Sequence, residues 1–101
     1  MPEFIKVTKK DGVRPGQVTN FFKEGKSIAI ANVDGKFYAF EDSCPHMSAR
    51  LSNGSLDGKV ITCPQHSSKF DVSTGKPLAV ADDPLVLYEV KVEGDDVLVK
   101  I

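Results

Sequence analysis

All the cysteines and histidines of this chain fall in two short segments, Cys44-Pro-His46 and Cys63-Pro-Gln-His66. The chain has 2 residues of each type, so they follow one another in the order C-x-H and then C-x-x-H. Thiolate and imidazole together are typical ligands of soft or borderline metal centres. We therefore expect Cys44, His46, Cys63 and His66 to hold a metal centre.

The arrangement of the two segments separates three interpretations. The cysteines could be structural thiols or a disulfide beside ordinary surface histidines, but chance rarely gives matched Cys/His pairs with a proline after each cysteine. A structural zinc site uses the same ligands, yet zinc spacings usually pair cysteine with cysteine and histidine with histidine. In a dinuclear iron–sulfur cluster each segment must reach both irons. One thiolate and one imidazole per segment therefore favour the cluster.

Short alternating segments separated by turn signals predict an all-β chain. We expect strands at residues 4–7, 18–22, 27–33, 36–40, 60–62, 86–92 and 97–101. Asp34-Gly35 is a strong signal for a two-residue hairpin. No stretch has convincing helical periodicity. These features predict an antiparallel β-sandwich or barrel.

The segment between the two metal-binding motifs contains two further turn signals, Asn53-Gly54 and Asp57-Gly58. A chain that turns back twice can bring the second motif beside the first. Pro45 and Pro64 each fix φ directly after a cysteine, which stiffens both loops. The loops are therefore expected to face each other between strands.

Composition narrows the classes of protein. With 101 residues the chain is expected to form one domain, residues 1–101. A net charge of −1 gives no support for nucleic-acid or membrane-surface binding. No apolar run is long enough to span a bilayer, and no secretory signal is visible. We expect a cytoplasmic protein, where two cysteines are more often ligands or thiols than a disulfide.

Two longer stretches carry a resemblance to a known family, CPHMSARLSNG at residues 44–54 and CPQHSSKFDVSTG at residues 63–75. Over residues 41–77 the chain resembles soluble Rieske-type ferredoxins of ring-hydroxylating oxygenases. It is also similar to the small subunit of nitrite reductase. The resemblance implies a Rieske-type fold, with a small cluster-binding subdomain at about residues 41–77 formed by two loops. It also implies one [2Fe–2S] cluster per chain, held by two cysteines and two histidines.

The resemblance implies a role for each ligand. Cys44 and Cys63 would hold the inner iron, and His46 and His66 the outer iron near the surface.

Other residues are assigned positions around the cluster by the same resemblance. Ser68 would donate a hydrogen bond toward the cluster, although its side chain could instead face solvent. Pro84 would lie in a loop that covers the third side of the cluster, although it could simply break a strand. Met47, Pro64 and Pro84 could form an apolar rim for docking. Charged residues that could surround this rim, or be ordinary solvated surface, are Glu41, Asp42, Arg50 and Lys69.

With all histidines assigned to one site, no mononuclear iron site, catalytic triad or histidine general base can be built. No glycine-rich phosphate motif supports flavin or nicotinamide binding. We therefore expect a monomeric electron carrier rather than an enzyme. It would pass electrons from an NAD(P)H-dependent flavoprotein reductase to a terminal oxygenase or similar enzyme. The alternative is an accessory or redox-sensing small subunit of a larger reductase, such as nitrite reductase.

Overall fold

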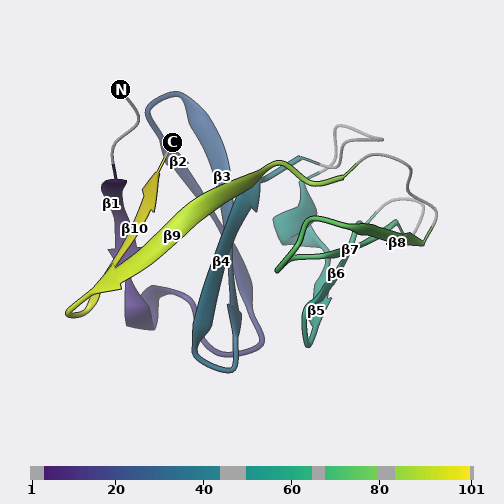
Figure 1. The fold of residues 1–101 in the computed structure, drawn as a ribbon, viewed down its shortest axis with the longest axis horizontal. Coiled ribbons are helices and arrows are strands. Elements are labelled where there is room, and N and C mark those ends of the chain that lie inside the picture. Colours follow the sequence, from purple (N-terminus) through teal and green to yellow (C-terminus); the bar gives the residue numbers. More distant parts are fainter. Residues whose placement is uncertain (1–3, 44–49, 65–67, 80–83, 101) are drawn as a thin grey trace.

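A computed structural model describes residues 4–43, 50–64, 68–79 and 84–100. Two antiparallel sheets make up this part of the chain (Figure 1). The six-stranded sheet has the order β1-β10-β9-β4-β3-β2. Its strands are β1 (Phe4–Lys9), β2 (Val18–Lys23), β3 (Lys26–Val33), β4 (Lys36–Glu41), β9 (Leu87–Glu93) and β10 (Asp96–Lys100).

The four-stranded sheet is inserted between β4 and β9 and has the order β5-β6-β7-β8. Its strands are β5 (Ser55–Asp57), β6 (Val60–Thr62), β7 (Lys69–Asp71) and β8 (Pro77–Ala79). Two 3-10 turns complete the described elements, η1 (Lys10–Gly12) and η2 (Leu51–Asn53). Figure 1 shows the small sheet beside one end of the larger one. The chain thus leaves the larger sheet after β4, builds the small sheet and returns at β9.

The all-β prediction is confirmed, and each predicted strand overlaps an observed one. Strands β5, β7 and β8 were not predicted: each has only 3 residues, and none is an uninterrupted β-branched run after a turn signal, as the equally short β6 is after Asp57-Gly58. So short a segment carries too little alternation to be recognised. The sequence therefore predicts the larger sheet better than the smaller one.

The turn signals have two different outcomes. Asp34 and Gly35 have φ values of 53° and 93°, as a type I′ hairpin requires, and they join β3 to β4. Asn53-Gly54 also marks a turn, but of another kind: Gly54 has φ −84°, follows the 3-10 turn η2, and donates its N–H to the Leu51 carbonyl oxygen at 2.9 Å. Gly54 instead permits a close approach, since a Cβ there would overlap the carbonyl oxygen of Thr62. This contact holds the start of β5 against the end of β6.

Two clusters of buried apolar side chains stabilise the molecule. The cluster inside the six-stranded sheet, here the barrel core, contains Val7, Val13, Ile28, Ile30, Phe37, Ala39, Val97 and Val99. The cluster shared by both sheets, here the interlayer core, contains Ala29, Ala31, Phe40, Leu51, Ile61, Cys63, Phe70, Val72 and Leu85. Because a predicted cluster ligand belongs to the interlayer core, packing of the two sheets also positions that ligand.

Strand β3 connects the two cores because both of its faces are buried. Ile28 and Ile30 belong to the barrel core, whereas Ala29 and Ala31 belong to the interlayer core. Alternate side chains of a strand point to opposite faces. The large isoleucine side chains therefore lie on one face of β3, and the small alanine side chains on the other. The alanines leave room for the second sheet, while the isoleucines fill the barrel.

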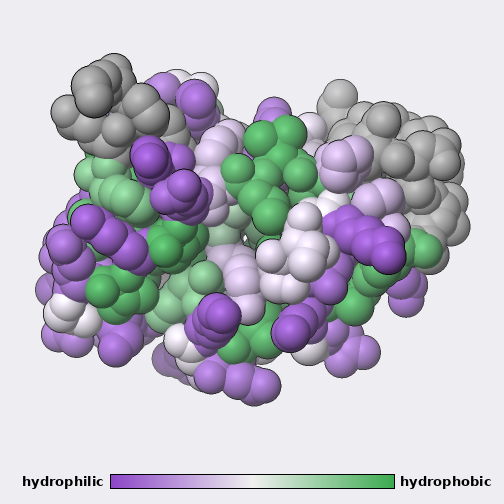
Figure 2. Space-filling view, viewed as in Figure 1, coloured by the Kyte–Doolittle hydropathy of each residue, from purple (hydrophilic) through white to green (hydrophobic). Residues whose placement is uncertain are grey.

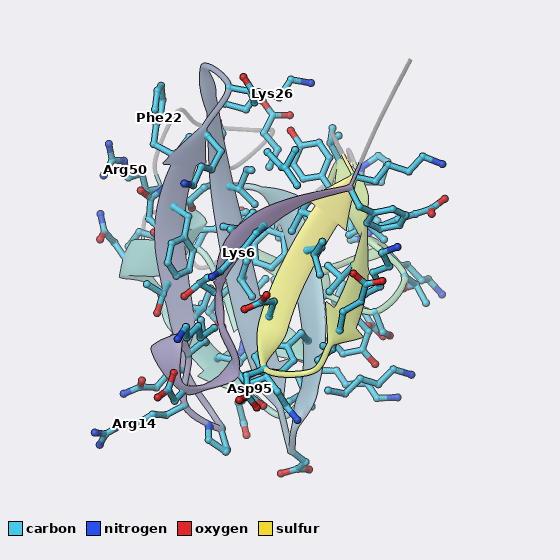
Figure 3. The ribbon with its side chains drawn as sticks, turned by 90° about the vertical axis from the view of Figure 1, so that its left-hand side faces the viewer. Lys6, Arg14, Phe22, Lys26, Arg50 and Asp95 are labelled. Atoms are coloured by element: carbon cyan, nitrogen blue, oxygen red, sulfur yellow. The ribbon has the colours of Figure 1, made fainter. Side chains whose placement is uncertain are left out.

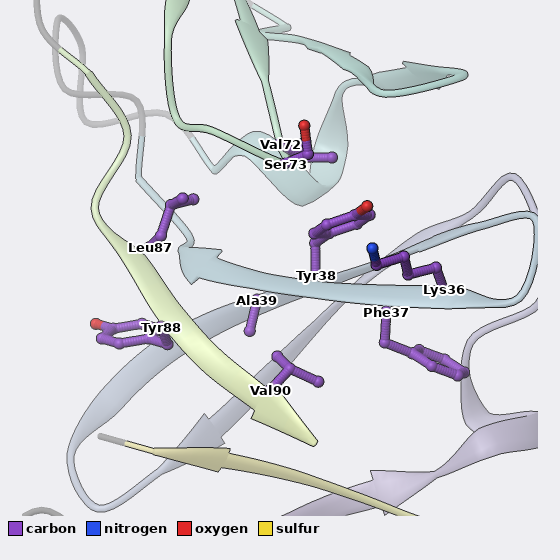
Figure 4. Close-up of a pocket in the computed structure, with 9 residues that line it drawn as sticks. All are labelled: Lys36, Phe37, Tyr38, Ala39, Val72, Ser73, Leu87, Tyr88 and Val90. Atoms are coloured by element: carbon purple, nitrogen blue, oxygen red, sulfur yellow. The ribbon is translucent and has the colours of Figure 1, made fainter. Parts of the chain in front are cut away.

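Packing between the sheets is incomplete where β4 and β9 approach the turn after β7. A cavity of about 210 Å³ lies there, with Tyr38, Ser73 and Leu87 among the residues that line it (Figure 4). Its polar lining residues, Lys36, Tyr38, Ser73 and Tyr88, are exposed or half-buried. We assign no ligand to this cavity.

The outer surface of the large sheet is mainly polar. Lys6 pairs with Asp96 at 3.3 Å, and Figure 3 shows Lys6 among side chains that leave the sheet. Figure 2 shows apolar residues interspersed with hydrophilic ones on the face of Figure 1. Within the described ranges, neither 3-10 turn is long or apolar enough to cross a membrane.

Candidate metal centre

The first predicted ligand loop follows β4 and ends before η2. Cys44 and His46 lie outside the described residues, as does Met47. A buried residue lies close to each end of this loop. Asp42 is 3% exposed and Leu51 is fully buried in the interlayer core. The loop is therefore anchored on each side of the two predicted ligands.

Hydrogen bonds to Asp42 close this loop at its base. Its Oδ1 accepts from the backbone N–H of Ser52 at 2.8 Å, and its Oδ2 accepts from the Ser52 hydroxyl at 2.6 Å. Asn20 Nδ2 also donates to Asp42 Oδ2, at 2.5 Å. The interpretation of Asp42 as an exposed rim charge is wrong, because these groups draw the carboxylate into the protein. Glu41, Arg50 and Lys69 are exposed, as the rim prediction requires.

The second predicted ligand loop begins at the end of β6. Cys63 is 2% exposed, and its backbone N–H donates to the carbonyl oxygen of Ser68 at 2.7 Å. This bond closes the loop that contains His66, which lies outside the described residues, and exposed Pro64. Ser68 is fully buried, so the alternative in which its side chain faces solvent is wrong. Its role toward a cluster stays a prediction.

The third loop returns the chain from β8 to β9. Pro84 is exposed, and the next residue, Leu85, is 6% exposed in the interlayer core. The Leu85 N–H donates to the carbonyl oxygen of Gly75 at 2.9 Å. Gly75 has φ +78°, and a Cβ there would lie 3.0 Å from the Leu85 oxygen. A glycine is therefore needed where this loop crosses the turn after β7. The covering role of Pro84 stays a prediction.

Two described groups have shifted pKa values. The pKa of Asp71 is lowered, chiefly because the Ser73 hydroxyl donates to its carboxylate at 2.5 Å, although burial acts in the opposite direction. Burial raises the pKa of Tyr88, and the negative charge of Glu41 adds to the effect. Both shifts keep the ordinary neutral-pH forms, a charged Asp71 and an uncharged Tyr88. Neither shift therefore produces an acid or base tuned near neutrality.

The donor set fits a [2Fe–2S] cluster. Cys63 places a soft thiol donor in a nearly dry site at a strand end, where a cluster would be shielded from water. The other thiol of the chain and both of its imidazoles belong to the first and second ligand loops. Among the described residues, no group of three or more His, Cys, Asp or Glu side chains could hold a metal ion elsewhere. The ligand assignment therefore rests on Cys44, His46, Cys63 and His66.

Sequence reasoning missed the hydrogen bonds that anchor these loops. Asp42 and Ser52 are 10 residues apart, and Asn20 and Asp42 are 22 apart. Neither spacing belongs to a local capping or turn pattern. An acidic residue just before a ligand segment and a serine just after it are a weak signal, which becomes informative only once the fold joins them.

Comparisons with known proteins agree with this geometry. The chain is 42% identical to the biphenyl dioxygenase ferredoxin subunit of Pseudomonas sp. strain KKS102, over 95% of this chain and 90% of that protein. It is 40% identical to the ferredoxin component of the naphthalene 1,2-dioxygenase system of Pseudomonas aeruginosa, over 85% of this chain and 84% of that protein.

Solved structures show the same fold. A structure described as the complex of reduced oxygenase and oxidized ferredoxin in carbazole 1,9a-dioxygenase matches with a TM-score of 0.91 and 38% identity, covering 96% of this chain and 92% of that one. A putative NADH-dependent nitrite reductase small subunit from Mycobacterium tuberculosis has a TM-score of 0.88 at 18% identity, covering 100% of this chain and 96% of that one. At such low identity the second match shows the fold alone. The Rieske [2Fe-2S] domain matches residues 3–89, and the chain belongs to this family, whose cofactor is the [2Fe–2S] cluster.

Proposed function

We propose that this chain is a one-electron carrier that supplies the terminal oxygenase of a ring-hydroxylating dioxygenase system. The observation that supports this most directly is its identity of 42% and 40% to ferredoxin components of two such systems, over most of each protein. The fold is consistent with the same role, and so are the two ligand loops, whose ends are joined by hydrogen bonds. The chain itself would not be an enzyme, because its Cys and His residues are all assigned to the cluster.

The proposed ligands divide into two kinds of donor. The Cys44 and Cys63 thiolates would hold one iron, and the His46 and His66 imidazoles the other. When bound, the cluster supplies single-electron transfer. The surrounding chain holds the thiolate of Cys63 away from water, and Ser68 closes the loop around His66 through its backbone oxygen.

The whole chain is proposed to act as a single Rieske domain, residues 1–101. Strand β1 pairs with β10, so segments from both ends of the chain complete one sheet. The proposed cluster-binding subdomain, about residues 41–77, contains the two ligand loops and strands β5, β6 and β7. Strand β8 and the Leu85 anchor extend the support beyond those boundaries.

Partners would dock at the cluster end of the molecule. Exposed apolar side chains are present near the third loop, with Leu78 49% exposed and Val86 51% exposed. Pro64, Pro84 and Lys69 are also exposed. A small mixed surface suits transient electron-transfer complexes. We propose an NAD(P)H-dependent flavoprotein as donor, because flavins convert hydride transfer into single-electron steps. The carrier would be a cytoplasmic monomer, since that compartment keeps ligand thiols reduced.

The alternative role as an accessory or redox-sensing subunit of a reductase has weaker support. The nitrite reductase likeness rests on 18% identity and therefore on fold alone. Co-purification with a large reductase, together with no electron transfer to an oxygenase, would favour that alternative.

Reconstitution tests the proposal. Iron, labile sulfide and zinc are measured first, and we expect two irons and two sulfides per chain. Turnover of the cognate oxygenase with its reductase is then compared with and without this protein, and it should require the protein. Lys69→Glu should change the transfer rate and its salt dependence. The matched charge reversal Lys10→Glu, on η1 away from the small sheet (Figure 1), should not. Stoichiometric zinc without sulfide, or equal turnover without the protein, would refute the proposal.

A further inference from the structure

Asp42 is the only acidic side chain that is buried among the residues that the structure describes. Burying a carboxylate is costly unless hydrogen bonds replace its water. Its two oxygens accept three hydrogen bonds, from Ser52 N, Ser52 Oγ and Asn20 Nδ2. A specific set of donors thus compensates the burial of this carboxylate. A charged side chain held in this way does not serve solubility, which indicates a structural role.

These donors come from separate segments. Asn20 lies on β2, and its Nδ2 also donates to the hydroxyl of Ser27 on β3 at 2.8 Å. The backbone N–H of Asp42 donates to the Ser27 carbonyl oxygen at 3.0 Å. Ser52 belongs to η2. Asp42 therefore connects the edge of the large sheet to the turn that follows the first ligand loop.

The connection spans the loop that carries Cys44 and His46. Asp42 precedes this loop and Ser52 follows it, so their two hydrogen bonds fix the separation of its ends. Fixing both ends reduces the conformations open to the loop. Removing a group that hydrogen-bonds directly to a metal ligand commonly changes metal affinity by about 10- to 100-fold. Asp42 acts on the loop and not on a ligand itself, so the lower end of this range is expected.

We propose that Asp42 is a positioning residue, which fixes the loop of the first ligand pair through Ser52 and Asn20. This inference rests on the proposed function, because it takes Cys44 and His46 as cluster ligands. It assigns to Asp42 an effect on how firmly the cluster is held, separate from any effect on overall stability.

Three variants separate geometry from charge. Asp42→Asn keeps the shape but brings an amide donor toward the donors of Asn20 and Ser52. The double variant Asn20→Asp with Asp42→Asn exchanges donor and acceptor, and the Ser27 hydroxyl can rotate to donate to the new carboxylate. Ser52→Ala removes one donor and leaves the backbone N–H in place, so it is the mildest change.

Asn32 provides a matched control. It is also 3% exposed, its Nδ2 donates to the Val13 carbonyl oxygen at 2.7 Å, and its Oδ1 accepts from Gly35 N at 2.7 Å. It lies near the β3–β4 hairpin, at the opposite end of β3 from Ser27. Asn32→Ala should therefore lower the melting temperature without loosening the first ligand loop.

The experiment follows loss of visible absorption after a chelator is added to the holoprotein, well below the melting temperature of every variant. EPR spectra of the reduced proteins are recorded in parallel. We expect Asp42→Asn to lose iron about tenfold faster than wild type with a changed EPR line shape. Ser52→Ala should lose it about threefold faster. The double variant should recover most of the wild-type rate, and Asn32→Ala should match wild type.

Different failures have different meanings. If wild type holds no iron and sulfide, both the proposed function and this inference are overturned. If wild type holds the cluster but Asp42→Asn and Ser52→Ala release it at the wild-type rate, only the inference is overturned. The same conclusion follows if Asn32→Ala accelerates release as much as Asp42→Asn, or if the double variant is no better than Asp42→Asn. If Asp42→Asn does not fold, the rate for Ser52→Ala decides.

Discussion

The two sheets of this protein are held together in different ways. In the larger sheet, β2–β3, β3–β4 and β9–β10 are adjacent pairs joined by short turns, and β3 alone has 8 residues. In the smaller sheet every strand has 3 residues. Strands that short are not stable alone. The smaller sheet therefore depends on the interlayer core, on its tied loops and on the cluster that the family carries.

The largest expected difference between the sheets comes from removing a ligand. Cys63→Ser replaces a soft thiolate in the interlayer core, so the protein should lose iron completely and become colourless. Protection of amide hydrogens from exchange should then fall in β5–β8, while β3 and β4 stay protected. Exchange measured by mass spectrometry, with wild type as reference, tests this. Equal loss of protection in both sheets would show that they fold as one unit.

Two matched substitutions, each of which creates a cavity in one of the two cores, sharpen the comparison. Ile30 in the barrel core and Ile61 in the interlayer core are both fully buried. Replacing either with alanine should lower the free energy of unfolding by about 2–5 kcal/mol. Ile61→Ala should also accelerate iron loss under native conditions, because it loosens the sheet next to Cys63. Ile30→Ala should not. Denaturant unfolding followed by circular dichroism and by visible absorption distinguishes them, and identical iron-loss rates would contradict the division into two cores.

The contrast between the sheets also explains what the sequence predicts. The larger sheet follows from alternation and from Asp34-Gly35, since both signals act between near neighbours. In β7 the residues are Lys69, Phe70 and Asp71, and one apolar residue between two charged ones is equally typical of a loop. Strand β8 begins with Pro77, which normally argues against a strand interior. These strands form because the interlayer core covers Phe70, which is a tertiary effect.

The candidate site likewise has one part that the sequence predicts and another that it does not. Its four ligands can be proposed from residue type and spacing, because the metal chemistry requires those side chains. The anchoring of the loops cannot, because Asp42 looks like a solvated charge until Asn20 and Ser52 are placed beside it. Burial of Ser68 likewise depends on how the small sheet packs. Support of the ligands is a property of the fold, whereas their identity is a property of the sequence.

Two glycines next to strands of the smaller sheet allow the stability cost of a steric clash to be compared with the cost of a left-handed backbone conformation. A Cβ at Gly54 would overlap the carbonyl oxygen of Thr62, whereas a Cβ at Gly58 would meet nothing within 4 Å, although Gly58 has φ +59°. Gly54→Ala should lower the free energy of unfolding by about 3 kcal/mol, the upper part of the range for overpacking. Gly58→Ala should lower it by about 1 kcal/mol, the cost of a left-handed residue. Denaturant titration measures both. Equal costs would show that the chain relaxes around Gly54.

The smallest expected effect is a pH-dependent one at the turn after β7. Ser73 donates to Asp71 through its hydroxyl at 2.5 Å and through its backbone N–H at 2.8 Å, and the pKa of Asp71 is lowered. A carboxyl whose pKa is lower when folded stabilises the protein above its unfolded pKa. That contribution disappears as the pH falls through the folded pKa. Ser73→Ala should therefore lower the free energy of unfolding by about 1 kcal/mol at neutral pH.

The difference between Ser73→Ala and wild type should shrink as the pH falls below the ordinary carboxyl range, because a protonated Asp71 accepts a weaker hydrogen bond. Ser73→Thr keeps a hydroxyl and is the matched control, which should retain most of the wild-type pH dependence. Unfolding titrations at neutral and acidic pH measure the three proteins. Since this turn also carries Gly75, which binds Leu85 N through its carbonyl oxygen, the iron-loss rate of Ser73→Ala should rise slightly. A stability difference that is the same at every pH would mean that the hydroxyl acts by packing into the cavity beside Tyr38, and not by stabilising the Asp71 charge.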